Sequence, residues 1–421
     1  MTGSSEVLHQ TPSLSSQGAL VLEAWKALGS DVGSSEVPWR QDLTQDFARG
    51  WPSAREEAWK YSPIAKLQES SLRPLADELR FELPEGVQAC RMSAASGVVL
   101  DRVRDLMKIS PAHRFNALAW LSDPWVVFVP RGVSPQAPLR VHAPRGEVNA
   151  WSCAGWLLVV DEDARLNVVE QYGAQVGALS WGTRMFLGSG SRVEHLRMQG
   201  AGVEAWGFAE SIALVSENAH YVQVQVSTGG KMCREDADVR LQGGGGQAHL
   251  DATFMARNEQ VLDHRTSIEH EVGDTQSHQL YKGLLADRSR GIFNGRVLIR
   301  RDAIGANAAQ LSQNLLLSPT AEINTKPELQ IDADDVKAAH GAAVGQLDKE
   351  HLFYLRSRGI SEAKAKEVLL LGFALEALRG LQDAELMRVG RAWIETEANV
   401  LLTERDTSLG AEASRTSGSA T

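Results

Sequence analysis

The chain has 421 residues, of which 43% are hydrophobic and 23% are charged, and this balance is ordinary for a folded protein of two or three structural units. Its formal net charge of -10 argues against nonspecific nucleic-acid binding and against docking on anionic membranes, because both need clustered lysine and arginine. No apolar run approaches the roughly 18–20 residues that span a bilayer. The first residues also lack a basic stretch followed by an apolar one, so we expect a cytoplasmic protein.

Cysteine is sparse and scattered. Cys90, Cys153 and Cys233 lie far apart in the sequence and form no C-x-x-C pair. Three isolated thiols cannot build a disulfide framework, and they predict no zinc or iron–sulfur site made by this chain alone. We expect each cysteine to be a small buried side chain.

The N-terminal region, residues 1–85, is predicted to be helical and is rich in tryptophan. Apolar residues spaced by one turn predict a helix over 20–29, which ends at a glycine. Further along, Trp51, Trp59 and Tyr61 are amphipathic residues of the kind found where structural units pack together. We expect them to attach a helical cap to the body of the protein.

Residues 86–343 are predicted to form short strands, because apolar and polar residues alternate between turns rich in Gly, Asn, Asp and Ser. A weak repeat marks this region: small residues that follow a polar turn and open a strand recur at nearly equal intervals, near Ala164, Ser191, Ala219 and Ala248. Such a long repeat without intervening helices favours a parallel β-helix over a sandwich, whose turn signals come more often and without a longer period. The clearest predicted strands are 156–160, 220–227, 249–254, 295–300 and 328–331.

The period changes to that of a helix after Gly345, so residues 344–403 are predicted to form a C-terminal helical domain. The first helix is predicted over 348–359, Ser361 is a suitable N-cap for the second, and a third is expected over 383–402. Residues 404–421 are small and polar, which predicts a disordered tail.

Sequence motifs of self-sufficient enzymes are absent. No Gly-x-x-x-x-Gly-Lys-Ser/Thr loop, G-x-S-x-G elbow or H-E-x-x-H pair occurs in the chain. The tetraglycine at 243–246 is not followed by Lys-Ser/Thr, and we interpret it as a turn. Nothing in the sequence therefore looks like a self-sufficient hydrolase, kinase or dehydrogenase.

A loose group of histidines and acids in the second half is the remaining candidate for chemistry. Side chains distant in sequence can stack on adjacent turns of a β-helix, and histidine is the commonest metal ligand. The competing interpretation is that these histidines are surface residues or hydrogen-bonded core residues, because no ligand spacing supports them. The group comprises His264, Glu269, His270, His278 and His340.

His340 differs from the other histidines in its neighbours, which are all small. Such a setting leaves the imidazole accessible to a ligand or a partner. The basic residues Arg265, Lys282, Arg296 and Lys326 are interpreted as strand-edge charges in solvent, and Pro327 as the entry to a strand. The neighbours of His340 are Ala338, Ala339, Gly341 and Ala342.

Several segments closely resemble the SufB/SufD family of iron–sulfur cluster assembly scaffolds, and within it they are most similar to the SufD subunit. The resemblance is dense from about 260 to 380 and thin from about 85 to 250. The matching segments are EEAWKYSPIAKL (56–67), HRTSIEH (264–270), SHQLYKGLLADRSRGIFNG (277–295), QNLLLSPTAEINTKPELQIDADDVKAAHGAAVGQLD (313–348) and LFYLRSRGIS (352–361).

This resemblance implies a right-handed parallel β-helix flanked by helical N- and C-terminal units. It implies a scaffold subunit that pairs with a SufB-like subunit through the β-helix and binds a SufC-like ATPase through its C-terminal helices. Such a complex assembles iron–sulfur clusters with sulfur from a cysteine desulfurase, and in some systems with electrons from reduced flavin. No cofactor is expected to be tightly bound by this chain alone.

The resemblance also places the family's interface histidine at His340, next to a cysteine of the SufB-like partner, where it helps to hold iron or a nascent cluster. Here the chain has Ala338 where many SufD proteins have a cysteine, so this subunit supplies no thiolate at that position. An imidazole can complete an iron site whose thiolates come from elsewhere. The acids Asp332, Asp334 and Asp335 precede it, and turn formation explains them most simply.

Two other functions stay open on the sequence. A homodimeric β-helix that binds iron or flavin by itself would retain metal when purified, whereas we expect this chain to be metal-poor. A carbohydrate-active β-helix enzyme would need paired carboxylates on one face of the solenoid, but the clustered acids here lie at turns.

Overall fold

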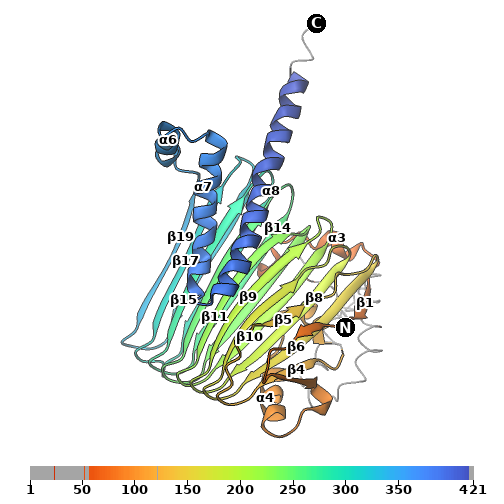
Figure 1. The fold of residues 1–421 in the computed structure, drawn as a ribbon, viewed down its shortest axis with the longest axis vertical. Coiled ribbons are helices and arrows are strands. Elements are labelled where there is room, and N and C mark those ends of the chain that lie inside the picture. The colour runs from red at the N-terminus through yellow and green to blue at the C-terminus, as the bar shows by residue number, and fades with distance from the viewer. Residues whose placement is uncertain (1–22, 24–51, 53–55, 121, 417–421) are drawn as a thin grey trace, which may run out of the picture.

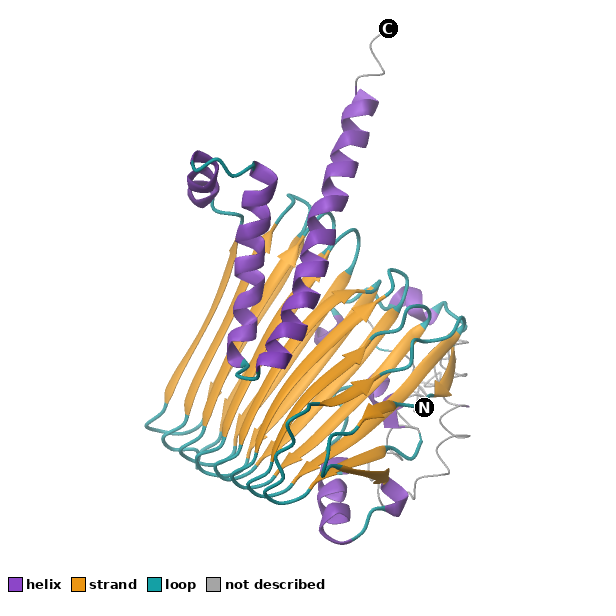
Figure 2. Cartoon of the chain, in the orientation of Figure 1, coloured by secondary structure: helices purple, strands orange, loops and turns teal. Residues whose placement is uncertain are grey.

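The computed structural model describes residues 23, 52, 56–120 and 122–416. The helix predicted over 20–29, apart from residue 23, and Trp51 lie outside these residues. The described chain forms a parallel β-helix with short N-terminal helices on one side and long C-terminal helices on the other (Figures 1 and 2). The predicted fold class is therefore confirmed. No helix within the described residues is long and apolar enough to cross a membrane.

Two sheets make up the β-helix, and from β4 onwards successive strands alternate between them. Sheet A contains β1 (Arg73–Ala76), β3 (Gln88–Arg91), β4 (Trp125–Val129), β6 (Ala150–Val160), β8 (Ala178–Leu187), β10 (Trp206–Val215), β12 (Met232–Leu241), β14 (Val261–His270), β16 (Arg290–Ile299) and β18 (Glu322–Ile331). Sheet B contains β2 (Arg80–Glu82), β5 (Leu139–His142), β7 (Arg165–Tyr172), β9 (Arg192–Ala201), β11 (His220–Gly229), β13 (Gln247–Ala256), β15 (Gln276–Leu285), β17 (Asn307–Leu316) and β19 (Lys337–Gly345).

Each strand from β6 to β17 pairs in parallel with the strand one turn later, as Arg165 of β7 does with Arg192 of β9. The small residues of the predicted repeat are all fully buried. The last member of the repeat is out of register with the one before it, because Ala248 pairs with Tyr221 and not with Ala219. The five strands predicted most clearly coincide with parts of β6, β11, β13, β16 and β18, and only residue 300 lies past the end of its strand.

A column of residues with positive φ forms one corner of the solenoid, and it explains why so many turns contain Asp, Asn or Gly. Asx and glycine residues alternate from turn to turn, and a Cβ on Gly245 would lie 2.2 Å from the Asn218 Oδ1 of the neighbouring turn. Glycine thus supplies both the left-handed backbone and the space for the adjacent side chain. The column consists of Asp163, Gly190, Asn218, Gly245, Asp274, Gly305 and Asp335. The tetraglycine therefore contains a structural turn, as predicted.

The N-terminal elements pack on the outer face of sheet A. Trp59 is buried against Phe115 at a centroid distance of 5.4 Å and against His113 at 4.9 Å, so the predicted role of this tryptophan as packing between units is confirmed. These helical elements are η1 (Glu57–Trp59), α3 (Ala65–Gln68), η2 (Met92–Ala94), α4 (Gly97–Met107), α5 (Arg114–Ala117) and η3 (Leu118–Trp120). Strands β1 and β2 also lie inside the region predicted to be helical, since their residues extend the two sheets.

The C-terminal helices α7 (Glu362–Leu375) and α8 (Ala384–Thr416) lie side by side on the outer face of sheet B, joined by η4 (Glu376–Gly380) (Figure 1). The short helix α6 (Lys349–Ser357) precedes them. Ser361 caps α7 as predicted, because its side chain accepts a hydrogen bond from the Lys364 N–H. Helix α8 continues past the predicted end at 402 into the segment predicted to be a disordered tail, which contains several helix-forming Ala and Glu residues.

The interior of the solenoid is apolar with fully buried polar groups. Glu170 pairs with Arg197 at 2.6 Å and accepts hydrogen bonds from the indole N–H groups of Trp156 and Trp181. Burial opposes ionisation of Glu170, but Arg197 and His195 outweigh it and hold the pKa of this carboxyl well below its usual range. The interior therefore tolerates a charged side chain where it is paired and hydrogen-bonded.

Candidate functional site

The last turn of the solenoid is open. Strands β18 and β19 each end their sheet, and within the described residues no strand pairs with their outer edges. Buried and exposed residues alternate along β17, but this alternation is lost in β19, where most residues are exposed. An uncovered strand edge with free backbone donors and acceptors is a surface to which another chain can add strands.

His340 lies on β19, in register with Gln310 of β17. Ala308, Gln310, Ser312 and Asn314 alternate as the buried residues of β17 and face the lumen, so the same parity directs His340 towards the mouth of the lumen. The residue is exposed because no further turn covers it. The structure thus places the predicted histidine on the terminal strand at the open end.

A ladder of polar side chains lies below His340 in the lumen. Gln310 donates from Nε2 to Oε1 of Gln279 at 3.3 Å, and Thr266 donates to the same oxygen at 2.7 Å. All three side chains are buried. The sequence reasoning missed the two glutamines, although each lies one solenoid turn before the next member of the column that ends at His340.

The surroundings of His340 agree with two further predictions and correct one. Asp335 has a φ of 51° and occupies the corner column, so it has a turn role. Ala338 pairs with Ala308, and neither residue carries a ligand atom. Pro327, however, does not open a strand but lies in the middle of β18, where an edge position tolerates a residue without an N–H.

His264 and His270 are buried away from the open end. His264 faces the lumen between Phe254 and Tyr281, at centroid distances of 4.9 and 5.9 Å, and burial lowers its pKa to about 3. His270 pairs with Thr275 and Ser277 at 2.8 Å each, and burial lowers its pKa to about 4. Both environments are those of neutral core histidines. Glu269 instead forms an ion pair with Arg300.

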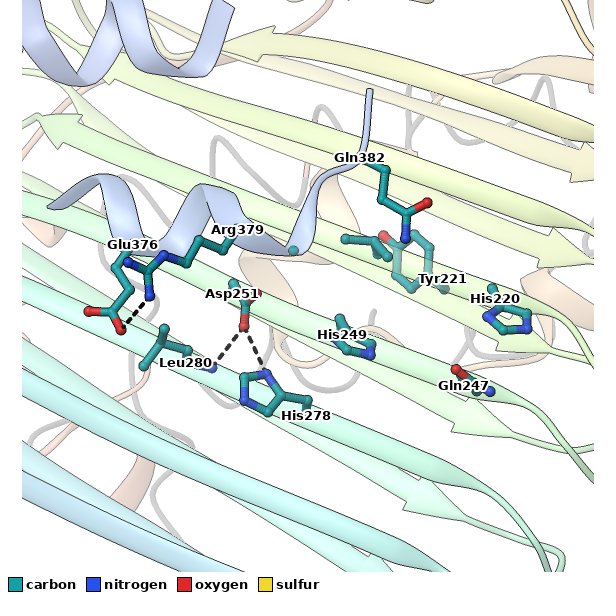
Figure 3. A pocket seen from close by; sticks show the side chains of 12 residues that line it. His220, Tyr221, Gln247, His249, Asp251, His278, Leu280, Glu376, Arg379 and Gln382 are labelled. Carbon is teal, nitrogen blue, oxygen red and sulfur yellow. Dashed lines mark hydrogen bonds and ion pairs between the residues drawn. The ribbon is translucent and has the colours of Figure 1, made fainter. Parts of the chain in front are cut away.

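His278 lies on the outer face of sheet B, in a groove of about 470 Å³ beside η4 (Figure 3). His278 Nδ1 is 3.3 Å from Asp251 Oδ1, and the interaction with this carboxylate raises the histidine pKa despite partial burial. The rings of His249 and His278 lie at an angle to one another with their centroids 5.5 Å apart, and His220 lines the same groove. The groove was not predicted from the sequence, although His220, His249 and His278 recur at equal intervals close to one solenoid turn.

The predicted histidine group does not converge. His264 and His270 are buried within the solenoid, His278 faces the outer groove and His340 lies at the open end. Within the part of the chain that the structure describes, no three His, Cys, Asp or Glu side chains are arranged to hold a metal ion. His340 is therefore the member that lies at the open end of the solenoid, apart from the other histidines.

The basic residues divide between solvent and core. Arg296 hydrogen-bonds Gln330, and Lys326 pairs with Glu328 at 2.5 Å, both at the surface as predicted. Lys282 was predicted to be a solvated charge and is instead 2% exposed, because it pairs with Glu376 of η4 and lies 4.0 Å from the centroid of the Phe373 ring. Arg265 is largely buried beside Asp263, which also corrects its prediction as a solvated charge.

The cysteines offer no accessible thiolate at the open end. Cys153 and Cys233 are 1% exposed, as predicted, and burial raises the pKa of both thiols. Cys90 is partly buried on β3, towards the other end of the solenoid. A sulfur ligand near His340 would therefore have to come from another molecule.

A second exposed surface lies on α6. Phe353 is 73% exposed and Tyr354 is 57% exposed, on a helix that has no buried residue. Only 346–348 separate this helix from the end of β19. Large exposed apolar side chains of this kind mark an interaction surface, here close in sequence to His340.

Comparison with known proteins places these features in a family. Residues 145–373 match the family described as SUF system FeS cluster assembly, SufBD core domain. The iron–sulfur cluster assembly protein SufD of Escherichia coli is 29% identical, over 88% of this chain and 96% of that protein. A SufBD family protein of Mycobacterium leprae is 27% identical over 83% of this chain and 91% of its own, and one of Synechocystis is 32% identical over 55% and 53%.

Proposed function

The chain belongs to the SufBD family of iron–sulfur cluster assembly proteins, and on this premise we propose that it is the SufD-like scaffold subunit of a SufBCD complex. In this proposal the chain catalyses no reaction itself. It pairs with a SufB-like subunit, binds a SufC-like ATPase, and receives sulfur indirectly from a cysteine desulfurase through the complex. The cytoplasmic location expected from the sequence is part of the same proposal.

The observation that carries the proposal is the position of His340 on the uncovered last turn of the solenoid. A SufB-like β-helix docked against β18 and β19 would satisfy their free backbone groups. The same docking would bring a cysteine of the partner towards His340. The open end therefore supports a shared site rather than one built by this chain alone.

Iron enters this site as a substrate of assembly. The imidazole of His340 supplies one nitrogen ligand, and the thiolates come from the partner, since both buried thiols of this chain are distant and have raised pKa values. A neutral imidazole adds no negative charge, so it suits an iron site whose other ligands are negatively charged thiolates. Reduced flavin, if the complex uses it, is expected to bind through the complex rather than tightly to this chain.

The ATPase is proposed to dock on the C-terminal helices, with Phe353 and Tyr354 of α6 as its main contacts. Dimerisation of two ATPase subunits on ATP binding would pull on α6. Because only 346–348 separate α6 from β19, this pull would reach the strand that carries His340 and rearrange the junction. ATP chemistry is thus coupled to the site without a nucleotide site on this chain.

The test is a His340→Ala variant expressed with both partners. We expect the complex to form and cluster assembly to fall at least 10-fold, because a ligand is lost while the strand edges are unchanged. His142→Ala is the matched control, since His142 lies on β5 at the other end of sheet B, and it should assemble clusters normally. Normal assembly by His340→Ala would sink the role given to this residue.

The alternative function is a homodimer that binds iron or flavin by itself. The same open edges of β18 and β19 favour it, because a second copy of this chain can also pair with them. Purification without the partners separates the two functions. Stoichiometric iron or flavin in the isolated chain supports the homodimer, whereas a colourless, metal-poor chain that joins its partners supports the scaffold.

A further inference from the structure

We propose that Gln310 is a positioning residue for His340: its side-chain oxygen accepts a hydrogen bond from one imidazole nitrogen, so that the other nitrogen faces the partner subunit as an unprotonated ligand. This inference rests on the proposed function and adds to it the residue that sets the tautomer of His340. It assigns a role to a buried polar side chain that the fold alone does not require.

The geometry begins with the register of the strands. Gln310 and His340 are direct neighbours on the parallel strands β17 and β19, and both face the lumen side of sheet B. Side chains in register on adjacent strands approach one another closely enough to interact. His340 has no residue of a following turn above it within the described residues, so Gln310 is its neighbour within the column.

The hydrogen bonds leave one atom of Gln310 unused. Its Nε2 donates to Gln279 at 3.3 Å, but its Oε1 is buried and has no hydrogen-bond partner in the described part of the chain. A buried carbonyl oxygen without a partner is unfavourable and uncommon in folded proteins, which points to a partner for this atom. His340 is in register with Gln310 on the next strand, and a neutral imidazole carries one N–H that can donate to a carbonyl oxygen. One hydrogen bond between the two side chains would satisfy the buried oxygen.

The position of the Gln310 amide is fixed by contacts with the preceding turn and with the facing sheet. Thr266 and Gln310 both donate to Oε1 of Gln279, which anchors the ladder. On the facing sheet, a Cβ on Gly295 would lie 2.1 Å from Gln310 Nε2, so the absence of a side chain at residue 295 provides the space that the amide fills. An anchored amide restricts the orientation of the histidine above it, as the outer partners of metal-binding histidines do.

The test measures the tautomer of His340 in the full-length chain labelled with 15N-histidine. Long-range 1H–15N spectra recorded at alkaline pH, where imidazole groups are neutral, report which nitrogen carries the proton, and a His340→Gln variant identifies the signal. In the wild type we expect one dominant tautomer, and in Gln310→Leu the mixture of a free imidazole. Identical shifts in the wild type and Gln310→Leu would overturn the proposal.

Two further variants separate positioning from a general structural effect. Gln310→Asn keeps the amide but shortens it by one methylene, so it should fold and still lose the tautomer preference. Ser312→Ala removes another buried polar group from the same strand, in register with Ala342, and should leave the His340 signal unchanged. A shift in Ser312→Ala equal to that in Gln310→Leu contradicts a specific role for Gln310.

Cluster assembly provides a separate readout. In the complex with both partners, Gln310→Leu should lower the rate of ferrous-iron-dependent assembly about 10-fold, as loss of an outer partner does at metal sites. If His340→Ala assembles clusters normally, the proposed role of His340 as a ligand fails, while the spectra still decide whether Gln310 orients the histidine. If the spectra show no preference, the positioning role fails whatever the assembly rate.

Discussion

At the scale of single residues, the solenoid gives similar side chains opposite roles according to the direction they face. His264 lies inside the lumen with a pKa lowered to about 3, whereas His278 lies outside and its pKa is raised by Asp251. His340 also faces the lumen side but lacks a covering turn. Accessibility at this position therefore depends on where the solenoid stops.

The buried neutral state of His264 predicts a pH dependence of stability. Its pKa is lowered from the ordinary 6.5 to about 3 in the folded chain, so the unfolded chain binds the extra proton, and stability present above pH 6.5 is lost as the pH falls towards 3. Through this residue, a fall in pH from 7 to 5 should lower the free energy of unfolding by roughly 2 kcal/mol. His264→Phe, which suits the aromatic neighbours, should remove this part of the acid sensitivity.

Chemical denaturation of the wild type and His264→Phe at pH 7 and 5 checks this prediction. Between pH 7 and pH 5, the unfolding free energy of His264→Phe should fall less than that of the wild type. Parallel pH profiles for the two proteins would rule out titration of His264 as a source of acid sensitivity.

Only part of the site was predictable from the residues. The small neighbours of His340 identified an accessible histidine, but the register that places Gln310 beneath it depends on turn lengths that vary from one solenoid turn to the next. The burial of Lys282 was missed for a related reason. Its partner Glu376 is 94 residues away on η4, and no local pattern indicates such a contact.

At the scale of elements, the C-terminal helices are docked firmly on sheet B rather than attached loosely. Apolar residues of α7 and α8 pack against Leu196, Val224 and other outward residues of the sheet. Asp383 caps α8 through the N–H groups of Glu385 and Leu386, and Glu194 of β9 accepts from the Asp383 N–H. A force applied to these helices is therefore transmitted to the solenoid.

The close contact between α8 and β9 predicts the effect of a small substitution. A Cβ on Gly200 would lie 2.6 Å from the indole of Trp393, so Gly200→Ala should lower the unfolding free energy by about 1–3 kcal/mol through overpacking. A Cβ on Gly341 would have Leu311 Cδ1 as its nearest atom, at an ordinary 3.4 Å, so Gly341→Ala should change stability by less than about 0.5 kcal/mol. Denaturant titration compares them, and equal stability of the two variants would contradict the packing argument.

The exposed face of α6 predicts a separable loss of one partner. Phe353→Asp should weaken capture of the SufC-like ATPase roughly 10-fold or more, because it places a charge in an apolar contact, while the SufB-like subunit still binds. Val148→Asp, at an exposed apolar residue far from α6 in the solenoid, is the control and should retain both partners. Co-purification from cells expressing all three chains measures this. Unchanged ATPase capture by Phe353→Asp would exclude α6 as the main contact.

The presence of helices and strands was predicted more reliably than the residues at which they begin and end. Ser361 and Gly359 mark the boundary between α6 and α7 by local chemistry, a side-chain cap and a positive φ, so both were predictable. The length of α8 was not, because the residues after 402 are small and polar but include good helix formers. Strands β1 and β2 were also missed, because their pairing partners β6 and β5 lie much later in the chain.

At the scale of the whole molecule, the two ends of the solenoid are different. At one end, β1, β2 and β3 pair with β6, β5 and β4, and the N-terminal helices cover sheet A. At the other end, β18 and β19 have no strand on their outer edges within the described residues. The sheets thus end in the short strands β3 and β2 on one side and in the long strands β18 and β19 on the other, and the long uncovered edges offer the larger surface for pairing with a related solenoid.

The central claim is that this open end is the surface that meets the SufB-like partner. Hydrogen–deuterium exchange of the full chain, alone and in the complex with that partner, tests it most directly. We predict that added protection is concentrated in peptides covering 322–345, which carry His340 and both terminal strands. Protection confined to other regions, with unchanged exchange over 322–345, would contradict the account.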